Sequence, residues 1–170
     1  MEFGTGFGVS ALWMARAARE NGLGHVWTID DLRGVRGLLE EAVRRLRAAG
    51  FMFPCETPGD LVDTLRRHLR LEEFLTIVAE TIDPGRLVAP SPIDFLFSDF
   101  GHAPEDVRAL LECLLPRMSP RASILIHSAS AYEPTRRLLE EFVASRGRRF
   151  SLVHLLERHD RAQNGAAWIR

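Results

Sequence analysis

The chain has 170 residues, which is enough for one well-buried hydrophobic core and too few for two ordinary domains. Its composition, 46% hydrophobic and 26% charged, is that of a globular chain and excludes an intrinsically disordered one. The net charge of -1 provides no long-range field for nucleic acid or an anionic membrane surface, and no apolar run is long enough to span a bilayer. We therefore predict a single domain over residues 1–170, with neither nucleic acid nor membrane among its partners.

The basic and sulfur-containing residues restrict the chemistry further. All 22 basic residues are arginine, so lysine is excluded as a catalytic base or Schiff-base former. Cys55 and Cys113 are far apart and form no CxxC unit, which is typical of reduced thiols. Because the N-terminus also shows no secretion signal, we expect a cytoplasmic protein.

Short β-rich runs alternate with longer helical stretches along the chain. Strands are expected at residues 1–3, 25–30, 75–78, 93–98, 123–126, 150–156 and 166–169. Helices are expected at residues 9–20, 35–49, 59–71, 104–118 and 133–146. This alternation predicts an α/β fold with a Rossmann-like, mostly parallel sheet and helices on both faces. The last two strands are joined without a helix, which predicts one antiparallel edge strand.

Several packing expectations follow from the same pattern. Apart from Asp94, the strand at 93–98 is apolar until its end, so we expect it to be buried on both faces. Trp13 and Trp27 are expected on the core side of their elements. Leu38 is expected on the apolar face of the amphipathic helix at 35–49.

A glycine-rich loop, Gly4-Thr5-Gly6-Phe7-Gly8, follows the first strand. Such loops let the backbone turn tightly and let a cofactor approach without a Cβ atom in the way. The spacing is G-x-G-x-G, and Val9 stands where a dinucleotide-binding loop has its third glycine. A β-branched valine would obstruct the close packing beside a pyrophosphate. The loop therefore favours a cofactor that lacks a pyrophosphate, although a tight turn with a helix N-cap remains the non-functional alternative.

An acidic residue, Asp30, ends the second strand. A carboxylate at this position can accept hydrogen bonds from both hydroxyls of a ribose. Asp31 follows directly, so which of the two acids faces the ribose stays open, with Asp30 favoured. The loop, its helix, the strand and the acid occur in the order that a nucleoside-containing cofactor requires.

These stretches resemble the first two motifs of the class I S-adenosylmethionine (SAM)-dependent methyltransferases, within them the small-molecule O-methyltransferases. Residues 2–12 resemble the first motif, and 26–30 the second strand with its ribose-binding acid; 78–81 and 93–99 resemble the ends of the third and fourth strands. The resemblance implies SAM as cofactor and transfer of its methyl group to a hydroxyl of a small molecule, such as a sugar or secondary metabolite. The cofactor-binding residues it implies are Glu2, Gly4, Thr5, Gly6, Gly8, Asp30, Glu80 and Asp99.

Two histidines and an acid near the fourth and fifth strands are the candidate catalytic residues. A hydroxyl acceptor must lose a proton, and His102 is the candidate base because an imidazole titrates near neutrality. His127 could lie across the same cleft, and Asp99 is the third member. The alternatives are a His102 that caps the helix beginning near 104 and a His127 that is buried and bonded to a carbonyl. A divalent metal is not favoured, because Ser128 replaces the second carboxylate that metal-using relatives have, and an imidazole-bearing set would suit an ion softer than Mg²⁺.

The chain begins inside the first motif, with at most three residues of the first strand. We expect either a true start upstream or a site completed by a partner subunit. A short, exposed first strand also predicts a homodimer. A catalytically degenerate methyltransferase fold that serves as a binding or assembly partner is the leading alternative. A nicotinamide-dependent oxidoreductase is a weaker one, since the chain has Val9 and no Tyr-x-x-x-Lys pair.

Overall fold

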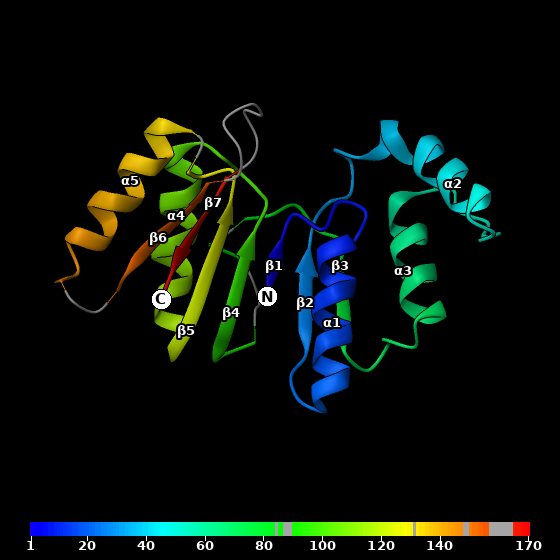
Figure 1. The fold of residues 1–170 in the computed structure, drawn as a ribbon, viewed down its shortest axis with the longest axis horizontal. Helices are drawn as coiled ribbons and strands as arrows, with labels where there is room; N and C mark the ends of the chain where they lie inside the picture. Colours follow the sequence, from blue (N-terminus) through cyan, green and yellow to red (C-terminus); the bar gives the residue numbers. More distant parts are fainter. Residues whose placement is uncertain (84, 87–89, 131, 148–149, 157–164) are drawn as a thin grey trace. The chain divides into compact units, whose positions relative to one another are not determined.

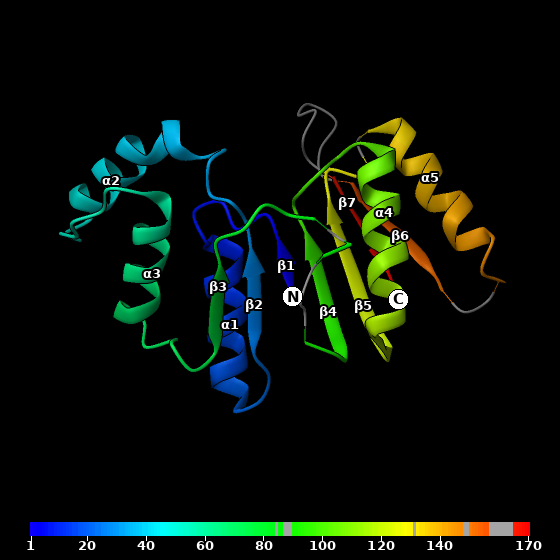
Figure 2. The ribbon, with the colours of Figure 1, turned by 180° about the vertical axis from the view of Figure 1, so that it is seen from behind.

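The computed structural model describes residues 1–83, 85–86, 90–130, 132–147, 150–156 and 165–170 (Figures 1 and 2). The chain divides into two compact units. The first unit is Glu2–Ile82, and the second is Asp83–Arg170 together with Met1. The expectation of a single domain stays a prediction.

The first unit contains a parallel three-stranded sheet in the order β3-β2-β1. The strands are β1 (Glu2–Phe3), β2 (Val26–Ile29) and β3 (Leu75–Val78), and the helices are α1 (Val9–Asn21), the 3-10 turn η1 (Arg36–Leu38), α2 (Leu39–Ala48) and α3 (Pro58–His68). Helix α1 packs against β2 and β3 (Figure 1). The core beneath it is formed by Ala11, Leu12, Ala15, Val26, Leu71 and Leu75.

The start of α3 is fixed by a capping box. The Thr57 hydroxyl accepts the Asp60 N–H at 3.1 Å, and the Asp60 carboxylate accepts the Thr57 N–H at 2.8 Å. Pro58 occupies the first helical position, where its missing N–H leaves no bond unmade. The helix therefore begins one residue before the predicted start, and it ends at His68, earlier than the predicted end at 71.

The second unit contains a mixed four-stranded sheet in the order β4-β5-β7-β6. Its strands are β4 (Ile93–Ser98), β5 (Met118–His127), β6 (Leu152–Leu156) and β7 (Gly165–Ile169), and its helices are α4 (Pro104–Leu114), the 3-10 turn η2 (Leu115–Arg117) and α5 (Glu133–Ala144). Helix α4 lies against one face of this sheet (Figure 2). β4 and β5 are parallel, whereas β7 is antiparallel to both β5 and β6. The predicted Rossmann-like α/β class with an antiparallel strand at the C-terminal edge is confirmed. The antiparallel strand β7 lies between β5 and β6, and β6 is the outermost strand.

Three packing expectations were wrong. In β4, Asp94 is exposed and Phe95 is 37% exposed, so this strand is not buried on both faces. Trp13 is 65% exposed, because the buried face of α1 is the one that carries the small residues Ala11 and Ala15. The Arg16 guanidinium lies over the Trp13 indole, 5.5 Å from the ring centroid. Leu38 is exposed because the first turn of the predicted helix is a 3-10 turn, which shifts the phase of the apolar stripe.

Within the described residues, every helix is too short or too polar to cross a membrane.

Candidate functional site

The glycine loop of the first unit connects β1 to α1 through backbone conformations that suit glycine. Gly4, Gly6 and Gly8 have φ angles of +89°, +52° and +76°. The Gly8 N–H donates to the Thr5 carbonyl at 2.7 Å, and the Gly8 carbonyl accepts the Leu12 N–H at 2.8 Å, which begins the helix. A Cβ atom on Gly8 would lie 2.6 Å from Cγ1 of Val62, a buried residue of α3. The third glycine is therefore required both by its φ angle and by the close approach of α3.

Asp30 closes this loop. Its Oδ2 accepts the Gly6 N–H at 3.0 Å, and its Oδ1 accepts the Leu32 N–H at 2.7 Å. Asp31 instead accepts the N–H of Arg33 at 3.0 Å, a local turn that does not involve the glycine loop. A carboxylate has about four lone-pair sites, so the half-buried Asp30 keeps acceptor capacity for further donors. Of the two acids, Asp30 is the one that belongs to the loop.

Glu2 lies at the centre of a buried network of hydroxyl groups. Its side chain is fully buried, and its two oxygens accept hydrogen bonds from the Ser10 and Thr28 hydroxyls. Because the Thr28 proton is directed to Glu2, the 2.6 Å bond between the Thr5 and Thr28 hydroxyls has Thr5 as its donor. The network joins β1, the loop, α1 and β2, a structural role that the sequence did not indicate. Direct contact between Glu2 and a cofactor amine stays a prediction.

Two further predicted cofactor residues, Glu80 and Asp99, are not part of the glycine loop. Glu80 is exposed and lies two residues beyond the end of β3. Asp99 belongs to the second unit, where its partner is a histidine.

In the second unit, the structure brings together the three predicted catalytic side chains. Asp99 directly follows β4 and His127 ends β5, and the parallel pairing of Ser98 with Ile126 places these two ends side by side. The Asp99 Oδ1 and His127 Nδ1 are 2.6 Å apart, with both side chains partly exposed. The His102 and His127 rings meet edge to face, with centroids 6.2 Å apart.

The hydrogen bond to Asp99 fixes the protonation pattern of His127. Nδ1–H donates to the carboxylate, so the neutral imidazole keeps its lone pair on Nε2. The Ser128 hydroxyl lies 3.2 Å from the same Nδ1. The alternative of a buried His127 bonded to a carbonyl is therefore wrong.

His102 is held through its backbone. The buried Thr135 hydroxyl donates to the His102 carbonyl at 2.5 Å. The preceding Gly101 has a φ of +57°, and a Cβ there would lie 2.7 Å from the Cβ of Asp106. The N-cap of α4 is Ala103, with no side-chain hydrogen bond, so the alternative that His102 caps this helix is wrong.

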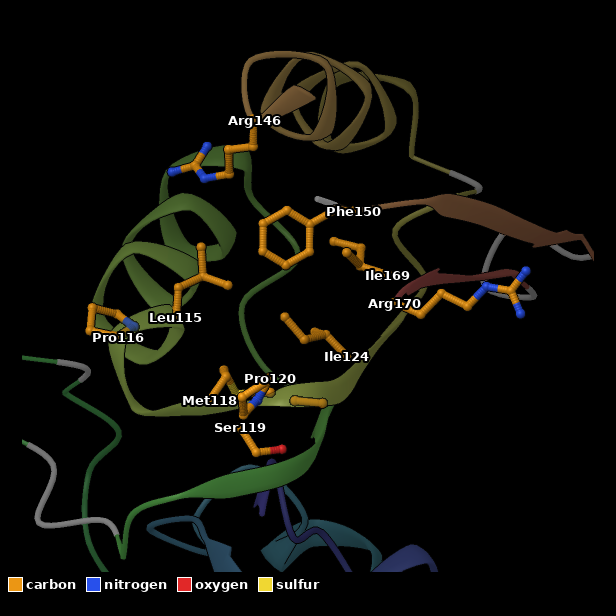
Figure 3. Close-up of a pocket in the computed structure, with 11 residues that line it drawn as sticks. Leu115, Pro116, Met118, Ser119, Pro120, Ile124, Arg146, Phe150, Ile169 and Arg170 are labelled. Atoms are coloured by element: carbon orange, nitrogen blue, oxygen red, sulfur yellow. The ribbon is translucent and has the colours of Figure 1, made fainter. Parts of the chain in front are cut away.

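A cavity of about 600 Å³ lies elsewhere in the second unit (Figure 3). Its apolar lining includes Leu115, Ile124 and Phe150, and it is formed at the beginning of β5, whereas His127 is at the other end of that strand. The cavity is therefore separate from the Asp99–His102–His127 cluster.

Comparison with known proteins identifies the family and the fold of the chain. The model of a family described as a methyltransferase domain matches residues 1–129, which include parts of both units. No curated protein matches the chain. Three similar solved structures each align with 99% of this chain.

The first is the O-methyltransferase from Bacillus cereus in complex with S-adenosylhomocysteine (SAH), at 19% identity, 71% coverage of that chain and a TM-score of 0.64. The second is the O-methyltransferase TomG from Streptomyces achromogenes, involved in tomaymycin synthesis and in complex with SAM, at 19% identity, 70% coverage and a TM-score of 0.60. The third is the SAH-bound methyltransferase PaMTH1 from Podospora anserina, at 12% identity, 69% coverage and a TM-score of 0.61. At these identities the likeness concerns the fold. Together with the family match it confirms the resemblance to class I methyltransferases, and the chain belongs to the methyltransferase domain family.

Proposed function

We propose that this chain transfers the methyl group of SAM to a hydroxyl of a small molecule, such as a sugar or secondary metabolite. The observation that carries the proposal is the glycine loop after β1, closed by the Gly6–Asp30 hydrogen bond onto the end of the adjacent parallel strand, in a chain of the methyltransferase family. Two of the similar structures are O-methyltransferases, one in complex with SAM and the other with SAH, which supports the cofactor and the type of acceptor.

The loop offers a partner for each polar part of SAM. The first turn of α1 contains no acidic residue and no side-chain cap, so its N–H groups and the helix dipole favour the methionyl carboxylate. The buried Glu2 carboxylate places negative charge beneath the loop, which attracts the cationic amine. The unused lone pairs of Asp30 accept the ribose hydroxyls.

The acceptor chemistry uses the cluster of the second unit. The acceptor oxygen attacks the methyl carbon, and the carbon–sulfur bond breaks with its electron pair moving to sulfur, which yields SAH. Because the cofactor already carries the activation, the protein has to align the acceptor and remove its proton. We assign the proton to Nε2 of His127, since Asp99 holds Nδ1–H and so keeps the Nε2 lone pair available. His102, the base expected from the sequence, lies beside His127. Among the described residues no carboxylate bonds to its ring, so His102 becomes the second candidate for the base.

The predicted homodimer and cytoplasmic location are also part of this proposal. Exposed apolar residues such as Val9 and Trp13, each 65% exposed on α1, support association with a second copy. Light scattering coupled to size-exclusion chromatography would show a mass of twice 19.2 kDa if the dimer forms. A monomer at micromolar concentration would contradict it.

Calorimetric titration of SAM and SAH into the purified chain tests the function. We expect 1:1 binding that weakens about ten- to a hundredfold in Asp30→Asn, since hydrogen bonds to a charged group contribute about 1.5–3 kcal/mol. Asp31→Asn is the matched control and should bind as the unmodified chain does. Equal loss in both variants would contradict the role of Asp30.

The same preparation separates the competing functions. Binding of SAM without any SAH formation against a panel of hydroxyl acceptors would favour a catalytically degenerate binding protein. Binding of NADH in place of SAM would favour an oxidoreductase.

A further inference from the structure

The cavity of about 600 Å³ in the second unit combines apolar walls with an arginine side chain (Figure 3). We propose that it binds a small carboxylate with an aliphatic tail, the carboxylate on Arg146 and the tail against the apolar walls. The volume lies in the range of pockets that hold small molecules, about 300–1,000 Å³. This site goes beyond the proposed methyl transfer, which does not use the cavity.

The charged side chains around the cavity are all of one sign. Among the described residues that line it are two arginines, Arg146 and Arg170, and no aspartate or glutamate. The Arg170 guanidinium points away from the other lining residues (Figure 3) and lies over Trp168, 5.1 Å from the ring centroid. Arg146 is therefore the cation that a ligand in the cavity can reach, and charge complementarity requires an anion.

Arg146 is held at the end of α5 by contacts that leave one edge of its guanidinium unused. Its Nη1 donates to the Phe142 carbonyl and to the Ser145 hydroxyl, each at 3.2 Å. Its Cζ lies 3.5 Å from the centroid of the Phe142 ring, which is buried. Among the described residues, no acceptor bonds to Nε or Nη2 and no carboxylate pairs with this guanidinium.

The unused edge selects the anionic group. The Nε–H and Nη2–H bonds form the fork that binds the two oxygens of a carboxylate through parallel hydrogen bonds. Because Phe142 and Ser145 already restrict the side chain, a ligand has little arginine motion left to arrest, which lowers the entropic cost of binding.

The rest of the lining selects the body of the ligand. Leu115 and Phe150 lie on either side of the cavity in Figure 3, and Ile124 and Ile169 form its floor on the sheet. The two isoleucines are paired across β5 and β7, so the sheet fixes their positions. Each methylene group that such walls bury contributes about 0.8 kcal/mol, which is a factor of about four in affinity.

The cavity is distinct from the proposed acceptor site. Successive side chains of a strand point to opposite faces, so Ile124 faces one side of β5 and His127, three residues further on, faces the other. A carboxylate in the cavity therefore does not occupy the place of an acceptor beside His127.

Calorimetric titration of sodium octanoate into the full chain at neutral pH tests the site. We expect 1:1 binding, with hexanoate about fifteenfold weaker because it lacks two methylene groups. Acetate has the charge without the tail and should show no measurable binding. Octan-1-ol has the tail without the charge and should bind about ten- to a hundredfold more weakly than octanoate.

Two substitutions separate the two parts of the site. Arg146→Gln should weaken octanoate about ten- to a hundredfold and leave octan-1-ol unchanged. Ala122→Phe places a ring in the cavity and should weaken both ligands at least tenfold. Arg121→Gln is the matched control, because Arg121 is exposed and does not line the cavity although it adjoins Ala122. It should leave both ligands unchanged, as should His127→Gln.

Four results would overturn the site. They are no binding of octanoate, acetate binding as tight as that of octanoate, equal losses in Arg146→Gln and Arg121→Gln, and octanoate binding that survives Ala122→Phe. Loss of octanoate binding in His127→Gln would place the ligand in the acceptor site and would also refute the proposal. Circular dichroism of each variant verifies that it is folded.

Titration of SAM into the same samples keeps this proposal separate from the proposed function. Octanoate binding without SAM binding would refute the methyltransferase activity alone. SAM binding without octanoate binding would refute the carboxylate site alone.

Discussion

Replacing Gly8 by alanine destabilises the glycine loop through two separate free-energy costs. The first is the left-handed backbone, at φ +76°, which costs a residue with a Cβ atom about 1–2 kcal/mol. The second is the contact of 2.6 Å between the new Cβ and Cγ1 of Val62, which is buried and cannot move aside freely. Overpacking of this kind costs about 1–3 kcal/mol. We expect Gly8→Ala to lower the free energy of unfolding by about 3 kcal/mol.

Gly22 isolates the backbone term. It has a φ of +65° at the end of the same helix, and no atom of the described part of the chain lies within 4 Å of the Cβ that an alanine would add. Gly22→Ala should therefore cost about 1–2 kcal/mol. In the Gly8→Ala, Val62→Ala double variant the overpacking is relieved. Its loss of unfolding free energy should therefore be about 1–2 kcal/mol smaller than the sum of the losses in the two single variants.

Urea unfolding followed by circular dichroism and tryptophan fluorescence measures these differences. Overpacking at Gly8 is excluded if Gly8→Ala costs no more than Gly22→Ala, or if the Val62 change gives no positive coupling. The first result would mean that α3 does not press on the loop. The second would mean that the loss comes from the backbone alone.

Three further changes test other parts of the account. Thr28→Val removes a hydroxyl donor from the buried carboxylate beneath the loop and should cost about 2 kcal/mol in urea unfolding; an unchanged midpoint would contradict the network. Hydrogen bonding to the side chain and backbone of Thr57 lowers the pKa of Asp60 from 3.8, so its stabilisation is present above that value and is lost as the pH falls through the lowered pKa. In Asp60→Asn, Tm should accordingly fall less steeply as the pH drops below about 4. If the pH dependence of Tm stays unchanged, the ionised Asp60 carboxylate does not stabilise the fold in this way. Thr135→Val removes the hydroxyl that donates to the His102 carbonyl and should lower the free energy of unfolding by about 1 kcal/mol; an unchanged urea midpoint would contradict this contact.

The fold class and the glycine loop were predictable because their signals are local in the chain. The alternation of β-rich and helical runs gave the order of the elements, and the spacing of Gly4, Gly6 and Gly8 marked the loop. The preference for Asp30 over Asp31 agrees with the hydrogen bond that only Asp30 makes to the loop.

Other features depend on register and packing, which a pattern along the chain does not contain. The pairing of Glu2 with Thr28 across β1 and β2 creates the buried network, and neither residue stands out for this role alone. Asp99 and His127 were each proposed from their strands, but their contact follows from the register of β4 with β5. The exposure of Trp13 was missed because α1 packs through its small residues.

We expect SAM to bind at the glycine loop, with its ribose on Asp30. A crystal structure of the chain with SAH would test this position. The ribose hydroxyls should lie within about 3.2 Å of the Asp30 carboxylate, and the homocysteine carboxylate should lie at the N-terminus of α1. A nucleoside bound on Asp31, or in the cavity at the beginning of β5, would contradict it.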